Sequence, residues 1–222
     1  MLLHQKGAGN GGAIAWLALW LVLLAAAGLA RAEGPATAVL PERCTAACVE
    51  PFGVPLGTAS GGVAAYSNCS ARCFVPVPNR VDGTYTGIRW QCVEYARRWL
   101  LERRGVVFGD VDVAADLWLK VDSVTRVGDG RVLPLAAQLN GAPEPPRVGD
   151  LLIYGREYLN TGHVAVVVAV DAAAGTVAVA EQNYRNARWA DGYARQIAWV
   201  RHGAEYWLLD PHLIGWKRVV DD

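Results

Sequence analysis

The sequence predicts an α+β fold, with N-terminal helices packed on an antiparallel β-sheet that the second half of the chain forms. Two observations support this prediction. Between residues 92 and 104 apolar positions recur at steps of three and four, which is typical of an amphipathic helix. After the turn-rich stretch 141–150, "GAPEPPRVGD", short β-branched runs alternate with turn residues, as in a sheet. Helices that precede strands in this way indicate the α+β class.

The first predicted helix lies in "QCVEYARRWLLERRG", residues 91–105. Its periodic positions are Cys92, Val93, Ala96, Trp99, Leu100 and Arg103. Glu94 lies early in the helix and Gly105 follows its basic end, which are the usual start and stop signals. A second helix is predicted around residues 113–121, "VAADLWLKV".

Three strands are predicted directly after the linker, at residues 151–155, 163–170 and 176–184, and three more come from "QIAWV", "EYWLLD" and "IGWKRV". The second and third strands are joined by "DAAAG", residues 171–175, a five-residue hairpin loop that ends in glycine. If the loop is symmetric, paired residue numbers sum to 346, so His163 lies opposite Asn183 and Ala165 opposite Glu181. His163 and Glu181 then share a face as diagonal neighbours, about 7–8 Å apart. A slip of one residue would turn the carboxylate to the other face.

Residues 1–32 are predicted to be a signal peptide. Lys6 precedes an uncharged run over residues 13–30, and "ARA" at Ala30–Ala32 offers small residues for cleavage. The alternative is an uncleaved membrane anchor formed by residues 13–30, because 18 apolar residues just reach spanning length. The sequence thus predicts the secretory pathway, with a secreted or lumenal protein if the leader is cleaved and a membrane-anchored one if it is not.

Residues 33–78 form a loop-rich lead-in with two C-x-x-x-C pairs, at Cys44, Cys48, Cys69 and Cys73. In an exported chain four such cysteines favour two disulfides over the alternative, a zinc knuckle. Three pairings are open, and the sequence does not choose among them. The triplet Asn68-Cys69-Ser70 also matches the acceptor pattern for N-glycosylation at Asn68.

The composition excludes several classes of protein. Lys+Arg and Asp+Glu are both 21, so no basic surface for a nucleic acid is expected. The 53% hydrophobic content and nine tryptophans supply a sizeable core, which argues against a disordered chain.

Cys92 is the odd cysteine, and its position at a helix start favours the thiolate, because unpaired backbone N–H groups there attract negative charge. The competing interpretation is a buried cysteine that acts as a small apolar residue. Amide chemistry also needs a base and a group that orients the base. Of the histidines outside the leader, His202 and His212 have the setting of surface residues, whereas His163 opens the most apolar strand and faces Glu181.

The blocks "WQCVEYARRWL", "GVVFGDV", "TGHVAVV" and "AEQNY", in this order, resemble the CHAP domain, a papain-like cysteine- and histidine-dependent amidohydrolase/peptidase. Within that family they are similar to the amidase domain of glutathionylspermidine synthetase/amidase. The resemblance covers residues 51–220. It implies that Cys92 is the nucleophile, His163 the base and Glu181 the orienting acid. It also implies substrate or oxyanion contacts for Gln91, Arg97 and Asn183, with no metal and no organic cofactor.

The resemblance implies hydrolysis of an amide, since 222 residues leave no room for an ATP-dependent synthetase half. The substrate is either a glutathione–polyamine amide, as in the similar amidase, or a peptide amide of a cell wall or other extracellular peptide, as export favours. The partner expected is therefore a small-molecule or peptide amide, and the membrane only if the leader stays uncleaved. A third hypothesis is a secreted binding module that has lost activity. For Arg97 the alternative is a solvated charge on the helix face.

Overall fold

The computed structural model describes residues 39–221, and these are mostly strands with two α-helices. The helices are α1 (Cys92–Arg104) and α2 (Asp116–Lys120), and a 3-10 turn, η1 (Glu42–Cys44), precedes them. The strands before the linker are β1 (Pro55–Thr58), β2 (Ala64–Tyr66), β3 (Pro78–Val81), β4 (Thr84–Ile88), β5 (Val106–Phe108), β6 (Ser123–Arg126) and β7 (Val132–Leu139). The strands after it are β8 (Leu151–Tyr154), β9 (His163–Asp171), β10 (Thr176–Ala180), β11 (Arg195–His202), β12 (Glu205–Leu208) and β13 (Leu213–Val219).

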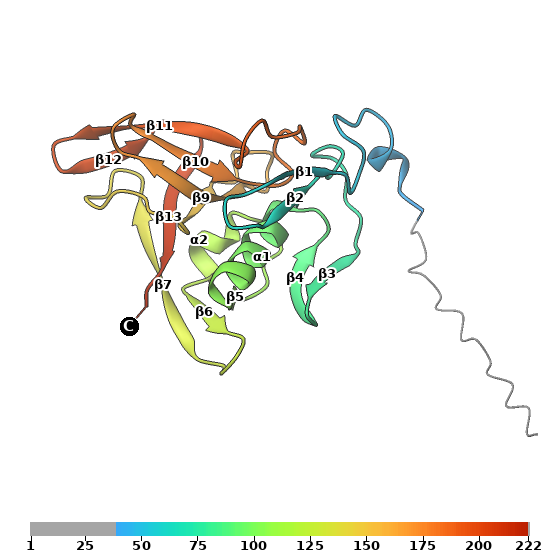
Figure 1. Ribbon diagram of the computed structural model, residues 1–222, viewed down its shortest axis with the longest axis horizontal. Helices are drawn as coiled ribbons and strands as arrows, with labels where there is room; N and C mark the ends of the chain where they lie inside the picture. Colours follow the sequence, from blue (N-terminus) through green and yellow to red (C-terminus); the bar gives the residue numbers. More distant parts are fainter. Residues whose placement is uncertain (1–38, 222) are drawn as a thin grey trace, which may run out of the picture. The chain divides into compact units, whose positions relative to one another are not determined.

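Nine strands form one antiparallel sheet in the order β12-β11-β10-β9-β8-β13-β7-β6-β5 (Figure 1). The pairs β1–β2 and β3–β4 form two small separate sheets. The expected order of helices before strands is therefore wrong in the first half of the chain. Four strands precede α1, and β5 to β7, which lie before the linker, belong to the main sheet. Strands β1 to β6 have only three to five residues, and the longer β7 contains Pro134 and two alanines, so none shows the β-branched runs of the second half.

Helix α1 begins and ends where its sequence signals predicted. Its N-cap residue Gln91 has an extended backbone, and Gly105 closes it in the left-handed region at φ 64°. The helix buries Tyr95, Ala96, Trp99 and Leu100 against the sheet. Each fully buried apolar side chain of this size contributes about 1.5–3 kcal/mol, so packing holds the helix on the sheet.

Both faces of the central strands are buried, which explains their nearly continuous apolar sequence. On β9, Val164 and Val166 pack into the core shared with α1, whereas Ala165 and Val167 pack into a second core. The second core includes Leu208 of β12 and Trp216 of β13, which are far apart in strand order. Tyr206 of β12 also bridges to Ala142 beyond β7, so the sheet curls around this second core.

The β9–β10 hairpin has the predicted register only at one end. Near the turn Thr176 pairs with Asp171, a sum of 347, which leaves a loop of residues 172–175. An irregularity between Ala178 and Val179 absorbs one residue, and from there Val179 pairs with Val167, a sum of 346. The register is thus as predicted at the end that carries His163 and Glu181. Strand β10 stops at Ala180 instead of Tyr184, so Asn183 does not pair with His163.

The lead-in contains two disulfides: Cys44–Cys73 joins the two outer cysteines, and Cys48–Cys69 joins the two inner ones. Three of these cysteines are buried and pack with Val75 in a small core of their own. The lead-in is more regular than expected, because β1 and β2 lie within it. Disulfides of this kind are typical of extracellular and secretory proteins.

The predicted leader over residues 1–32, and the alternative anchor at 13–30, lie outside the described residues. Within residues 39–221, no helix is long and apolar enough to span a membrane.

Candidate active site

Cys92 is the free cysteine of the described residues, and it is the first residue of α1. Burial by itself would raise the pKa of its thiol, but the neighbouring His163 and the backbone N–H groups of Val93 and Val164 outweigh burial and lower that pKa. His163 and these N–H groups thus favour the thiolate form of Cys92.

His163 is the first residue of β9, and only 2% of its surface is exposed. Its Nε2 lies 2.8 Å from Oε2 of Glu181, and because the carboxylate accepts, Nε2 carries a proton. Nδ1 is then the ring nitrogen left for the Cys92 sulfur. Burial would lower the pKa of His163, but the charge of Cys92 and the contacts with Glu181 raise it to about 9.

Glu181 follows the last residue of β10, and its carboxylate is 3% exposed. Burial would raise the pKa of this carboxyl, but His163 and then Arg195 hold it below its usual value. Arg195 Nε donates to Glu181 Oε1 over 2.7 Å, on the oxygen that His163 leaves free. Arg195 could not be predicted from the sequence, because a loop of residues 181–194 separates β10 from β11 and gives no register to count from.

Gln91 and Asn183 both line the cleft beside Cys92 and hydrogen-bond each other. Asn183 Nδ2 donates to Gln91 Oε1 over 2.9 Å, and Gln91 Nε2 donates to Asn68 Oδ1 over 3.1 Å. The expected pairing of Asn183 with His163 is therefore replaced by a contact with Gln91. Asn183 adopts a left-handed backbone, φ 54°, because the chain turns away after β10.

Asn68, the candidate for N-glycosylation, is fully buried in the folded domain. Its Nδ2, the atom that would carry a glycan, donates to the carbonyls of Ser70 and Cys73. Its Oδ1 accepts from Gln91 and from the Trp90 backbone. Asn68 thus supports the residue that precedes the nucleophile.

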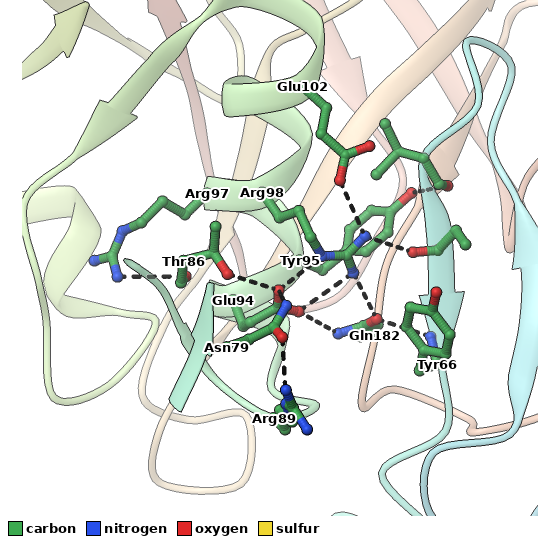
Figure 2. Close-up of polar contacts among 12 residues, drawn as sticks. Tyr66, Asn79, Thr86, Arg89, Glu94, Tyr95, Arg97, Arg98, Glu102 and Gln182 are labelled. Atoms are coloured by element: carbon green, nitrogen blue, oxygen red, sulfur yellow. Dashed lines mark hydrogen bonds and ion pairs between the residues drawn. The ribbon is translucent and has the colours of Figure 1, made fainter. Parts of the chain in front are cut away.

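Arg97 is not a solvated charge, and it is not among the residues that line the cleft over Cys92, so its contact with a substrate stays a prediction. It is 1% exposed, and its guanidinium donates to the carbonyls of Thr86, Phe108 and Gly109 and pairs with Asp110 over 3.0 Å. Five residues after Cys92 its side chain points to another side of α1, where it holds the loop that carries Asp110. Figure 2 shows Arg97 and Arg98 extending to opposite sides of the helix.

A buried network joins α1 to the segment that carries Glu181 (Figure 2). At its centre Glu94 accepts hydrogen bonds from Asn79, Thr86, Arg98 and Gln182. Gln182 also accepts from Arg98 and from the Tyr66 backbone, and donates to the Gln91 carbonyl. Gln182 lies between Glu181 and Asn183 in the sequence. Because its side chain is fixed in this network, the Glu181 side chain is held toward His163 and the Asn183 side chain toward Gln91. No sequence pattern predicted it.

A cleft of about 670 Å³ opens over the sulfur. Its lining includes Gln91, Cys92, His163 and Asn183, the apolar Phe74 and Val111, and the carboxylates of Asp110 and Asp112. His202 is exposed, and His212 is exposed at the rim of a smaller cavity, as expected for surface residues. Among residues 39–221 no cluster of His, Cys, Asp and Glu has the geometry of a metal site.

Comparison with known proteins places this arrangement in a family. Residues 83–183 match the CHAP domain. The chain is 35% identical to trypanothione synthetase of Crithidia fasciculata over 160 residues. This alignment covers 72% of this chain and 24% of that protein. The chain is 35% identical over 187 residues to the bifunctional glutathionylspermidine synthetase/amidase of Escherichia coli (strain K12), an alignment that covers 78% of this chain and 30% of that protein. It is 32% identical over 186 residues to glutathionylspermidine synthase of Crithidia fasciculata, covering 77% and 26%. The chain thus spans less than a third of the length of these relatives.

Proposed function

Because residues 83–183 belong to the CHAP domain family, we propose that this protein is a cysteine amidohydrolase with Cys92 as nucleophile, His163 as base and Glu181 as orienting acid. The observation that carries the proposal is a free thiol at a helix start, beside a buried histidine that a carboxylate holds at 2.8 Å. These are the three requirements of thiol-based amide hydrolysis.

In the proposed mechanism the Cys92 thiolate attacks the amide carbonyl carbon, and the carbonyl oxygen becomes an oxyanion. The backbone N–H of Cys92 stabilises that oxyanion, and the Gln91 side chain does so by exchanging its long hydrogen bond to the Cys73 carbonyl; each donor contributes about 3 kcal/mol. Imidazolium Nδ1 of His163 gives its proton to the leaving amine, and the C–N bond breaks to leave a thioester. Water then attacks the thioester while His163 takes its proton, and the acid and the thiolate are released.

For the substrate we favour a glutathione–polyamine amide. The support is similarity to a relative whose name includes glutathionylspermidine amidase. The exposed Asp112 of the cleft lining also complements a protonated polyamine, whereas the charge of Asp110 beside it is paired with Arg97.

A second candidate substrate is a peptide amide of a bacterial cell wall or another extracellular peptide. The two disulfides favour it, since they persist in oxidising compartments where such peptides lie. In that case the protein is secreted or lumenal. An inactive secreted binding module is the third hypothesis, and it predicts an inert Cys92 thiol.

The first experiment offers the purified protein both glutathionylspermidine and peptidoglycan fragments and identifies the products by mass spectrometry. We expect amide hydrolysis by the native protein and no turnover by Cys92→Ala, with an unchanged circular dichroism spectrum. Amide hydrolysis retained in Cys92→Ala would refute the proposed nucleophile.

Alkylation separates the enzyme from the binding module. We expect rapid labelling of Cys92 by iodoacetamide near neutral pH, and much slower labelling in His163→Ala. A thiol that reacts slowly in both proteins would favour the module.

A further inference from the structure

Five adjacent strands bring one polar side chain each to the same end of the main sheet. Tyr154 ends β8, His163 begins β9, Glu181 follows β10, Arg195 begins β11 and Asp210 follows β12. This grouping arises because neighbouring strands are antiparallel, so the end of one lies beside the start of the next. The proposed catalytic His163 and Glu181 are thus two members of a longer row.

Arg195 connects the members of this row. Its Nε donates to Glu181 Oε1 over 2.7 Å, and one terminal nitrogen donates to Asp210 Oδ2 over 2.8 Å. The other terminal nitrogen donates to the Tyr154 hydroxyl over 3.1 Å, and that hydroxyl donates to Asp210 over 2.6 Å. Arg195 also lies over the Tyr184 ring, 4.4 Å from its centroid. With only 13% of the Arg195 side chain exposed, these contacts leave it a single orientation.

We infer that Arg195 is a positioning residue for amide hydrolysis: it holds one oxygen of Glu181 so that the other faces His163, and it keeps that carboxylate ionised. The inference rests on the proposed function, because it gives Arg195 a role in the same reaction. Arg195 acts through Glu181 and His163 and does not touch the reacting atoms.

The physical reason lies in the burial of Glu181. A buried carboxylate favours its protonated form unless cations or donors hold the charge. A neutral Glu181 would no longer stabilise the imidazolium, and the imidazolium in turn stabilises the Cys92 thiolate. Arg195 therefore supports the Cys92 thiolate indirectly, through Glu181 and His163. Asp210 balances the positive charge of Arg195.

The pH dependence of this row involves every titratable group around Glu181. These are His163 from β9, Arg195 from β11, Tyr154 from β8, Tyr158 from the loop between β8 and β9, and Asp210 after β12. Arg195 and His163 are the cations among them, so they set the charge of Glu181 in the acidic range.

The experiment measures the rate of Cys92 alkylation by iodoacetamide from pH 4 to 9 in the native protein and in Arg195→Gln. We expect the midpoint at which the thiolate forms to rise by about one pH unit in the variant, since loss of a contacting cation moves a carboxyl pKa by about 1–3 units. Below the midpoint this shift slows labelling about tenfold. The acidic limb of kcat/KM should move in the same direction.

Arg201→Gln is the matched control, because Arg201 lies on the same strand, is exposed and stacks only on Tyr206. It should leave the midpoint unchanged. If Arg195→Gln does not fold, Arg195→Lys takes its place, because lysine keeps the positive charge and loses the several N–H donors of the guanidinium. This variant should shift the midpoint less than Arg195→Gln, and it should lower kcat without changing KM. A folded Arg195 variant with the native midpoint and kcat would overturn the inference. Labelling of the native protein that does not depend on His163 would instead refute the proposed function.

Discussion

At the scale of single residues, the site depends on charges that alternate from the cleft to the far side of the sheet. Cys92, whose pKa is lowered by His163, lies beside that histidine; His163 contacts Glu181, and Arg195 contacts the other oxygen of Glu181. Each buried charge has an opposite neighbour, which is the condition for keeping charges out of water. The pKa values of these groups therefore move together.

This coupling predicts the pH dependence of activity. The pKa of His163 is raised to about 9, so kcat/KM should fall as the pH rises through about 9, where the leaving amine loses its proton donor. In Glu181→Gln Cys92 still raises this pKa but the contribution of the Glu181 carboxylate is lost, so the alkaline limb should move to lower pH. Profiles of kcat/KM between pH 5 and 10 measure both limbs. An alkaline limb at the same pH in both proteins would contradict the assignment of Glu181.

At the scale of elements, the site is assembled where α1 and the ends of β9 and β10 meet. Gly162 lets the backbone before His163 pack closely against its neighbours. It has a φ of 70° and lies against Ala115 and the Tyr154 carbonyl. A Cβ at Gly162 would be 2.4 Å from that carbonyl oxygen. Only glycine fits here, and its neighbour His163 is positioned as a result.

Gly162→Ala should therefore reduce both stability and activity. We expect a loss of at least about 2 kcal/mol in the free energy of unfolding, from backbone strain and a clash with a fixed carbonyl. Urea unfolding followed by tryptophan fluorescence measures it. Gly128→Ala is the control, because open space surrounds Gly128, and it should change stability by less than about 0.5 kcal/mol. Equal free energies of unfolding for the two variants would show that the chain can accommodate a Cβ between residue 162 and the Tyr154 carbonyl.

At the scale of the whole described domain, the disulfide-linked lead-in forms part of the cleft wall. Arg72, Cys73 and Phe74 line the cleft, and the Cys73 carbonyl accepts hydrogen bonds from Asn68 and Gln91. The bridges therefore stabilise the domain and support the residue beside the nucleophile.

Removal of the Cys44–Cys73 bridge should have two effects. In Cys44→Ser/Cys73→Ser, unfolding should become easier by about 2–4 kcal/mol, a fall in Tm of roughly 5–15 °C. KM should rise because the cleft wall and Gln91 lose support. Differential scanning calorimetry and steady-state kinetics measure these changes. A variant with native Tm and KM would mean that the bridge supports neither.

Local patterns were enough to predict α1, the strands after the linker and the meeting of His163 with Glu181. Helical periodicity and hairpin arithmetic describe residues that are close along the chain. The predicted β9–β10 register is wrong by one residue near the turn, but the irregularity between Ala178 and Val179 restores it before His163 and Glu181. The pairing of the four cysteines, the inward direction of Arg97, the burial of Asn68 and the contact of Arg195 with Glu181 came from packing. Each of these depends on segments joined by long loops or separated by many elements, where the distance along the chain says nothing about the distance in space.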